Sequence, residues 1–218
     1  MDCCDPNGLD QMFAGPLVHQ ELRAYRANGL NKRQQKLMTL LEPVLSNSSV
    51  LDIGCGIGAL GTALLTKGAG EGTFVDVSSA YLAAAREVAV EAGVGERAVF
   101  YRDDFATSAR PYSQADVVVL DRVVCCYPDA VALLVKAARH SRGTLVFTYP
   151  RPFWFVRLFR AFCAFGMKLS GREYRFFLHD PALLMRAATG SGHTRVVVRS
   201  AGVWQLMKVS KTSSTQNG

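Results

Sequence analysis

The sequence lacks several patterns that mark specialised classes of protein. It has six cysteines, but none are spaced Cys-x-x-Cys and no paired histidines accompany them, so a structural zinc site is not expected. Its start is acidic and lacks the basic and then apolar segments of a secretory signal peptide. The apolar stretch 153–169 is too short and too charged for a membrane span. These absences predict a cytoplasmic protein with reduced thiols.

The chain does have a large apolar fraction and an excess of positive charge. Hydrophobic residues make up 49% of its 218 residues and charged residues 20%, which allows a sizeable core and excludes wholesale disorder. Its 25 Lys and Arg exceed its 18 Asp and Glu, so the net charge is +7 and anions are attracted. The basic residues are scattered rather than gathered in one tract, so nucleic acid is not an expected partner.

The hydrophobic pattern predicts alternating strands and helices after a helical start. Residues 11–45 have helical spacing with a break at Asn28-Gly29. Strands are expected at 49–53, 73–77, 98–102, 115–120, 143–149, 194–199 and 202–209. Helices are expected at 58–67, 79–92, 129–140 and 181–190, with Ser78 and Asp180 as N-caps.

This alternation predicts an α/β fold with a Rossmann-like, seven-stranded mixed sheet and helices on both faces. The first five strands are short and rich in valine, as in a parallel sheet covered on both sides. The last two strands are separated only by Ser200-Ala201 before Gly202, which predicts an antiparallel terminal hairpin. We expect one domain over 49–209, an N-terminal helical cap over 1–48 and a disordered tail over 210–218.

A glycine-rich loop follows the first expected strand. Asp52 lies in that strand, and the loop is Gly54-Cys55-Gly56-Ile57-Gly58, where missing side chains let a ligand lie against the backbone. The segment 56–61 also fits the dinucleotide pattern Gly-x-Gly-x-x-Gly. Two features oppose that alternative: Gly54 already ends the strand, and the Asp52 carboxylate suits a cationic ligand better than a pyrophosphate.

The loop and the acidic residues after later strands resemble class I S-adenosylmethionine-dependent methyltransferases. That resemblance implies S-adenosylmethionine as the cofactor. It implies that Asp76, with Val77 beside it, holds the ribose hydroxyls, that Asp104 and Phe105 contact the adenine, and that Asp121 lies beside the methionine part. Asp103 is a rival for the role of Asp104. The expected cofactor-binding set is Asp52, Gly54, Cys55, Gly56, Gly58, Asp76, Val77, Asp104, Phe105 and Asp121.

The remaining segments are expected to cover the cleft and select the acceptor. An insertion over 151–178 contains an aromatic helix at 153–169, which caps the cleft or contacts a membrane surface peripherally. Its aromatic and basic residues suit a small, lipophilic or planar acceptor carrying carboxylates. The expected reaction is therefore methyl transfer to such an acceptor, with O-methylation favoured.

Within the class, the chain is similar to magnesium-protoporphyrin O-methyltransferases through its N-terminal run from His19 to Gly29 and through Tyr127-Pro128. Cys126 stands where those enzymes usually have a histidine. The catalytic candidates are Tyr127, Cys126 and His19, and no metal site is expected. Two alternatives stay open: methylation of a thiol or soft metalloid substrate using Cys125 and Cys126, and donor binding without methyl transfer.

Overall fold

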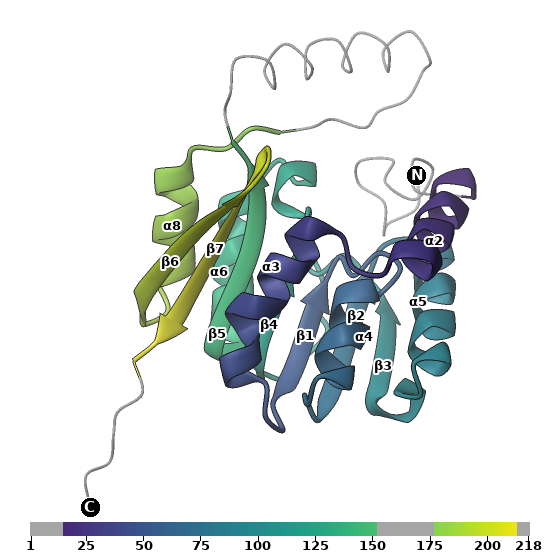
Figure 1. Cartoon of the computed structure of the whole chain (residues 1–218). Helices are drawn as coiled ribbons and strands as arrows, with labels where there is room; N and C mark the ends of the chain where they lie inside the picture. Colours follow the sequence, from purple (N-terminus) through teal and green to yellow (C-terminus); the bar gives the residue numbers. More distant parts are fainter. Residues whose placement is uncertain (1–14, 152–176, 213–218) are drawn as a thin grey trace, which may run out of the picture.

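The computed structural model describes residues 15–151 and 177–212, which build one seven-stranded sheet (Figure 1). Its order is β3-β2-β1-β4-β5-β7-β6. Strands β1 to β5 run parallel, and β7 is antiparallel to both β5 and β6. The strands are β1 (Ser49–Ile53), β2 (Glu71–Asp76), β3 (Ala98–Arg102), β4 (Ala115–Leu120), β5 (Ser141–Pro150), β6 (His193–Ala201) and β7 (Trp204–Lys211). The predicted mixed sheet with its terminal hairpin is confirmed.

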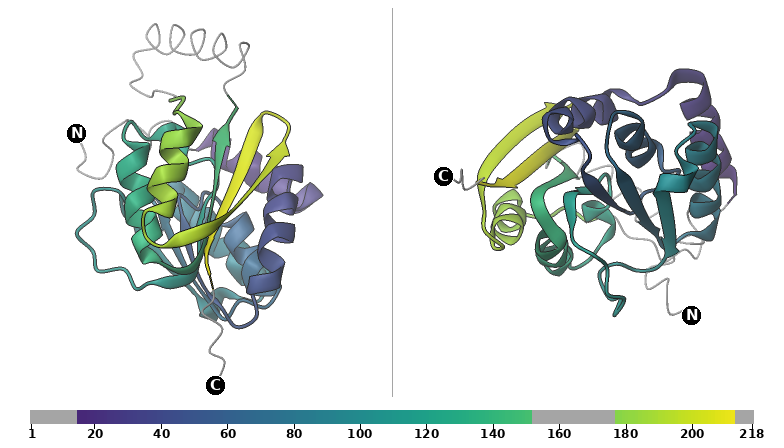
Figure 2. Two further views of the ribbon diagram at one scale, coloured as in Figure 1. Left: turned by 90° about the vertical axis from the view of Figure 1, so that its left-hand side faces the viewer. Right: turned by 90° about the horizontal axis from the view of Figure 1, so that it is seen from below.

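Helices cover both faces of the sheet, also as predicted. The α-helices are α2 (Pro16–Asn28), α3 (Lys32–Leu41), α4 (Ala59–Thr66), α5 (Ser79–Glu91), α6 (Ala130–His140) and α8 (Pro181–Thr189). Three short 3-10 helices lie between these elements in the described residues: η1 (Glu42–Val44), η2 (Gly95–Arg97) and η3 (Val124–Cys126). Viewed along the strands, α3, α4 and α5 lie on one face, and α6 and α8 lie on the other (Figure 2).

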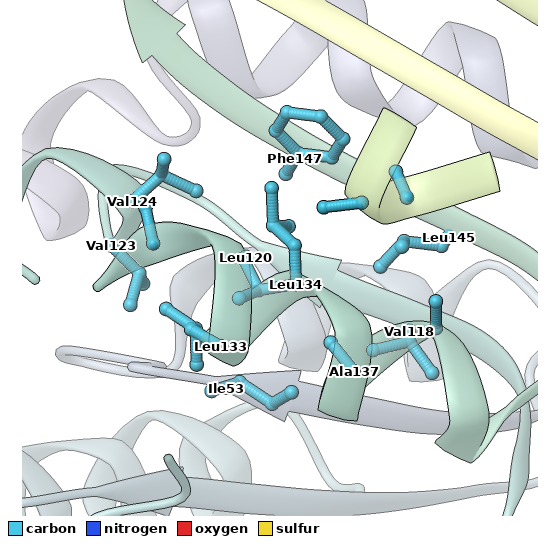
Figure 3. Close-up of a cluster of buried hydrophobic side chains, with 14 of the residues drawn as sticks. Ile53, Val118, Leu120, Val123, Val124, Leu133, Leu134, Ala137, Leu145 and Phe147 are labelled. Carbon is cyan, nitrogen blue, oxygen red and sulfur yellow. The ribbon is translucent and has the colours of Figure 1, made fainter. Parts of the chain in front are cut away.

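The strands alternate their side chains between two apolar clusters. In β1, Leu51 and Ile53 belong to the cluster under α6 and α8, whereas Val50 belongs to the cluster under α3 and α4. Figure 3 shows Leu133 and Leu134 of α6 packed among side chains of β1, β4 and β5. Both leucines are fully buried. Burial on two faces explains why the central strands are continuous apolar runs in the sequence.

Local signals set most element ends. Ser78 caps α5 by accepting a hydrogen bond from the Tyr81 amide, and Asp180 caps α8 in the same way from the Ala182 amide. The predicted break at Asn28-Gly29 is confirmed, since α2 ends at Asn28 and Gly29 has a φ of 66°. The amphipathic α2 and α3 thus occupy much of the N-terminal segment that was predicted to be helical.

Some boundaries were predicted wrongly. The hairpin turn is Gly202-Val203, because β6 continues to Ala201 and pairs there with Trp204. Strand β7 extends to Lys211, so Ser210 belongs to the sheet and not to the expected tail. β2 and β5 each start two residues before their predicted starts.

The predicted aromatic helix at 153–169 lies outside the described residues, as do Cys3, Cys4 and Cys163. Within residues 15–151 and 177–212, no helix has the length and apolar character that crossing a bilayer requires.

Candidate active site

The candidate site lies at the carboxyl ends of β1 and β4, which are neighbours in the centre of the sheet. The chain leaves β1 for α4 on one face and leaves β4 for α6 on the other (Figure 2). Such a switch point opens a crevice in an α/β sheet, and ligands bind there. The glycine loop connects β1 to α4 and therefore borders this crevice.

Glycines in the loop are required by backbone conformation and by close neighbours. Gly54 has a φ of 65°, and a Cβ built on it would lie 2.4 Å from a methyl group of Val123. A Cβ on Gly58 would lie 2.9 Å from the Cβ of Ala85. A Cβ on Gly56 would meet only the Tyr81 ring, at 3.8 Å. The loop therefore packs tightly at Gly54 and Gly58 and leaves room for a ligand at Gly56.

Asp76, the last residue of β2, ties that strand to the glycine loop. One carboxylate oxygen accepts the Gly56 N–H at 2.8 Å, and the other accepts the Ser78 N–H at 2.9 Å. The side chain is mostly buried, at 8% exposure. A carboxylate oriented in this way beside an open stretch of backbone is suited to accept hydroxyl hydrogen bonds from a ligand.

Asp52 is buried on the α4 side of β1 and accepts the Gly61 N–H at 3.2 Å. Burial, followed by the negative charges of Asp121 and Asp76, raises the pKa of Asp52 to about 8. At neutral pH the group is therefore mostly protonated. A cation bound nearby favours its ionised form, which fits the expectation that Asp52 compensates positive charge on a ligand.

The raised pKa of Asp52 predicts how stability depends on pH. The carboxyl group ionises near pH 4 when unfolded and near pH 8 when folded, so the folded state holds the extra proton between these values. The free energy of unfolding should then fall as pH rises through this window. Asp52→Asn should remove much of this fall. Urea denaturation should therefore show that the free energy of unfolding decreases less between pH 5 and pH 8 in the variant than in the parent. An identical pH dependence in both proteins would contradict the assignment.

Asp104 and Asp103 have different environments. Asp104 is 2% exposed and accepts hydrogen bonds from the Ala106 amide, the Thr107 hydroxyl and the Tyr127 hydroxyl. Asp103 instead accepts from Ser108 and Tyr112 and lies 3.5 Å from Arg110. Asp104 is thus the acid that faces the segment after β4.

Phe105 lies in the core beside this pair of acids. Its ring packs at 5.4 Å from that of Tyr112 and 5.3 Å from that of His140, and it is 2% exposed. The sequence-based expectation placed this ring against the adenine. In the structure the ring belongs to the apolar cluster under α6 and α8. Val77, half-buried, accepts the Arg102 Nε–H through its carbonyl.

Asp121 makes an ion pair that the sequence did not indicate. Arg33, near the start of α3, donates to its two carboxylate oxygens at 2.7 and 2.8 Å. Thr148 of β5 donates to the same carboxylate at 2.9 Å. The two charged side chains are only 12% and 10% exposed, and the Arg33 guanidinium lies 5.4 Å from the centre of the Trp204 ring. Helix α3 is thereby attached to the carboxyl end of β4.

A second contact joins α2 to the residue after Asp121. Glu21 of α2 accepts a hydrogen bond from the Tyr81 hydroxyl at 3.1 Å and lies 3.4 Å from Arg122. Arg122 has a φ of 67°, which is uncommon for a residue other than glycine. Its amide donates to the Thr148 hydroxyl, which supports this backbone conformation. No sequence motif indicated Glu21, Tyr81 or Thr148.

The three catalytic candidates lie in different surroundings. The Tyr127 hydroxyl is bonded to Asp104, and burial together with that bond raises the pKa of Tyr127. The Cys126 thiol lies 3.4 Å from the Arg122 carbonyl oxygen. His19 is exposed on α2. Tyr127 is therefore a hydrogen-bond donor rather than a base, and Cys126 lies in η3, shortly after the carboxyl end of β4.

Cys55 in the glycine loop donates its thiol hydrogen to the Gly56 carbonyl. Burial and the nearby carboxylates of Asp76 and Asp52 raise the pKa of this thiol. It contributes an uncharged, compact side chain to the loop.

Comparison with known proteins agrees with this geometry. Residues 50–143 match a family described as "Methyltransferase domain". No curated protein sequence matches the chain. The fold is similar to that of magnesium protoporphyrin IX methyltransferase from Synechocystis PCC 6803 with bound SAH, with a TM-score of 0.72 and 19% identity over 94% of this chain and 98% of that one.

Two further solved structures share the fold. One is an O-methyltransferase family protein from Burkholderia thailandensis, with a TM-score of 0.70 and 18% identity over 93% of this chain and 62% of that one. The other is an O-methyltransferase family 2 protein from Planctomyces limnophilus DSM 3776 in complex with apigenin, with a TM-score of 0.65 and 20% identity over 97% of this chain and 63% of that one. This chain spans less than two thirds of these two proteins. Residues 50–143 thus match a methyltransferase domain, and the described part of the chain shares the fold of these solved methyltransferases.

Proposed function

We propose that this protein transfers the methyl group of S-adenosylmethionine to an oxygen atom of a small, lipophilic or planar organic acceptor. The observation that carries the proposal is the position of Asp76, whose carboxylate is hydrogen-bonded to Gly56 where the glycine loop leaves room for a ligand. Bound S-adenosylmethionine supplies an electrophilic methyl carbon on a sulfonium. The residues of the chain then have to bind the donor and the acceptor, orient them for transfer and exclude water.

Each acidic residue has a separate task in this proposal. Asp76 accepts the ribose hydroxyls, Asp104 accepts the adenine amino group, and Asp52 ionises to balance the positive charge of the donor. Asp121 lies at the methionine end and is held in place by Arg33 and Thr148.

The acceptor assignment rests on the groups around this end of the sheet. The Arg33 guanidinium lies over the planar Trp204 ring, and Arg122, which pairs with Glu21, places a second cationic side chain directly after Asp121. Two of the solved structures with this fold are a porphyrin methyltransferase and a protein in complex with apigenin, and both names refer to planar molecules. Because the raised pKa of Tyr127 makes it a poor base, a carboxylate oxygen that is already ionised is the favoured nucleophile.

A transfer assay tests the proposal. The purified protein is incubated with methyl-labelled donor and, separately, with a dicarboxylate porphyrin, a flavone phenol, an aliphatic amine and a thiol. We expect label in the oxygen acceptors, and a base-labile methyl ester where a carboxylate reacts. Label in only the amine or the thiol would overturn O-methylation. Tight donor binding with no transfer to these acceptors or to any component of a cell extract would favour a donor-binding protein.

A further inference from the structure

The vicinal thiols of Cys125 and Cys126 converge although the residues are adjacent in the chain. Neighbouring side chains in an extended strand point to opposite faces, but η3 turns these two toward the same point. Their sulfur atoms lie 3.9 Å apart, and both lie within 3.5 Å of the Arg122 carbonyl oxygen. Cys125 is 3% exposed, whereas Cys126 is partly accessible. The methyltransferase mechanism leaves this dithiol without a role.

The separation of the sulfurs suits a bridging atom better than a disulfide. A disulfide needs the sulfurs at about 2.05 Å and Cα atoms usually at least about 4.4 Å apart, but adjacent Cα atoms lie about 3.8 Å apart. When two sulfur atoms are each bonded at about 2.3 Å to one soft atom, and the angle between the bonds lies between a right angle and the tetrahedral angle, the sulfur atoms are about 3.3–3.8 Å apart. The observed 3.9 Å is close to that span.

A metal cation fits the dithiol poorly. Among residues 15–151 and 177–212, no group of three or more His, Cys, Asp or Glu side chains is arranged to hold a metal ion. The hydrogen bond between the two thiols, followed by burial, raises the pKa of Cys125, so forming the thiolate that a metal requires is costly. A suitable ligand needs only two sulfur bonds and must accept the two thiol protons itself.

We propose that Cys125 and Cys126 form a binding site for one trivalent organoarsenical, held through both sulfurs. An arsenoxide reacts with two thiols to form two As–S bonds. Its oxygen takes both thiol protons and leaves as water, and arsenic stays trivalent, so no oxidant or reductant is needed. The site adjoins the donor loop, because Val123 at the start of this segment is the residue packed on Gly54. The proposal concerns binding and is independent of the acceptor for methyl transfer.

The test uses phenylarsine oxide as the probe and native mass spectrometry as the readout. The full chain carries Cys3→Ser, Cys4→Ser and Cys163→Ser, so Cys55, Cys125 and Cys126 are its only thiols. We expect one phenylarsenic group per chain in place of two thiol hydrogens, resistant to excess glutathione and removed by 2,3-dimercaptopropanol. Cys125→Ala and Cys126→Ser should each lose this adduct, while Cys55→Ser should keep it.

A second measurement keeps the test valid if a variant fails to fold. The parent is treated with the arsenical, unfolded in urea so that every unprotected thiol can react, alkylated with iodoacetamide and mapped by peptide mass analysis. Protection of both Cys125 and Cys126, with Cys55 giving the same alkylation as in untreated protein, is the expected result. An adduct that persists in both single variants, or equal alkylation of Cys125 and Cys126 with and without the arsenical, would overturn the proposal.

Discussion

Asp76→Asn is expected to weaken binding of S-adenosylhomocysteine about 100-fold, because hydrogen bonds to a charged group contribute about 1.5–3 kcal/mol each. The amide can replace only one acceptor oxygen, and its NH₂ group would face a backbone N–H at Gly56 or Ser78. The variant should therefore also lose about 1–3 kcal/mol of stability. Calorimetric titration measures the first effect, and urea denaturation measures the second.

Asp116→Asn is the matched control for this loss of stability. Asp116 also accepts a backbone N–H, from Ser49 at 2.9 Å, and also lies in the parallel sheet. It belongs to the amino-terminal end of β4, and Arg142 beside it lowers its pKa to about 2. The control should lose stability but keep affinity for S-adenosylhomocysteine. Near-parental affinity in Asp76→Asn would exclude the ribose assignment.

Arg33→Met is expected to destabilise the protein by about 3 kcal/mol, because it leaves the poorly exposed Asp121 carboxylate without its countercharge. Methionine keeps much of the length of the side chain, so loss of charge dominates over loss of packing. Urea denaturation checks the value. The affinity for S-adenosylhomocysteine should fall as well, since the pair holds α3 against the carboxyl end of β4, where we propose that the donor binds.

The double variant Arg33→Met with Asp121→Asn separates the ion pair from other effects. If the cost of Arg33→Met comes from an unpaired carboxylate, the double variant should be more stable than Arg33→Met alone. Arg26→Met is the control, since Arg26 also pairs with acids, Glu87 and Glu91, but on the surface. It should change stability little. If the losses of stability caused by the two single substitutions simply add in the double variant, Arg33 and Asp121 do not stabilise the protein through each other.

The sequence predicted the elements of the fold that depend on local pattern. The central strands are buried on both faces, so they appear as short apolar runs, and the acids after them mark the carboxyl edge of the sheet. The N-caps Ser78 and Asp180 were also predictable, because each bonds to a backbone amide only two or three residues later in the chain. The hairpin turn was misplaced because Gly202 supplies the left-handed conformation of the turn while Ala201 still pairs within the sheet.

The contacts that complete the candidate site join segments far apart in the chain. Arg33 and Asp121 are separated by 88 positions, and one arginine among 25 basic residues gives no signal of its partner. Asp103 and Asp104 are adjacent, so only the fold shows that Asp104 faces Tyr127. Pairings of this kind depend on how elements pack, which the spacing of residues in one sequence does not encode.

The most direct test of the central claim is calorimetric titration of the full chain with S-adenosylhomocysteine, with NAD titrated in parallel. The account predicts one S-adenosylhomocysteine bound per chain and no binding of NAD, since we propose that Gly54 and Gly56 after β1 belong to the loop of a methyl-donor site. Binding of NAD without S-adenosylhomocysteine would mean that residues 56–61 form a dinucleotide loop, and the account would be contradicted.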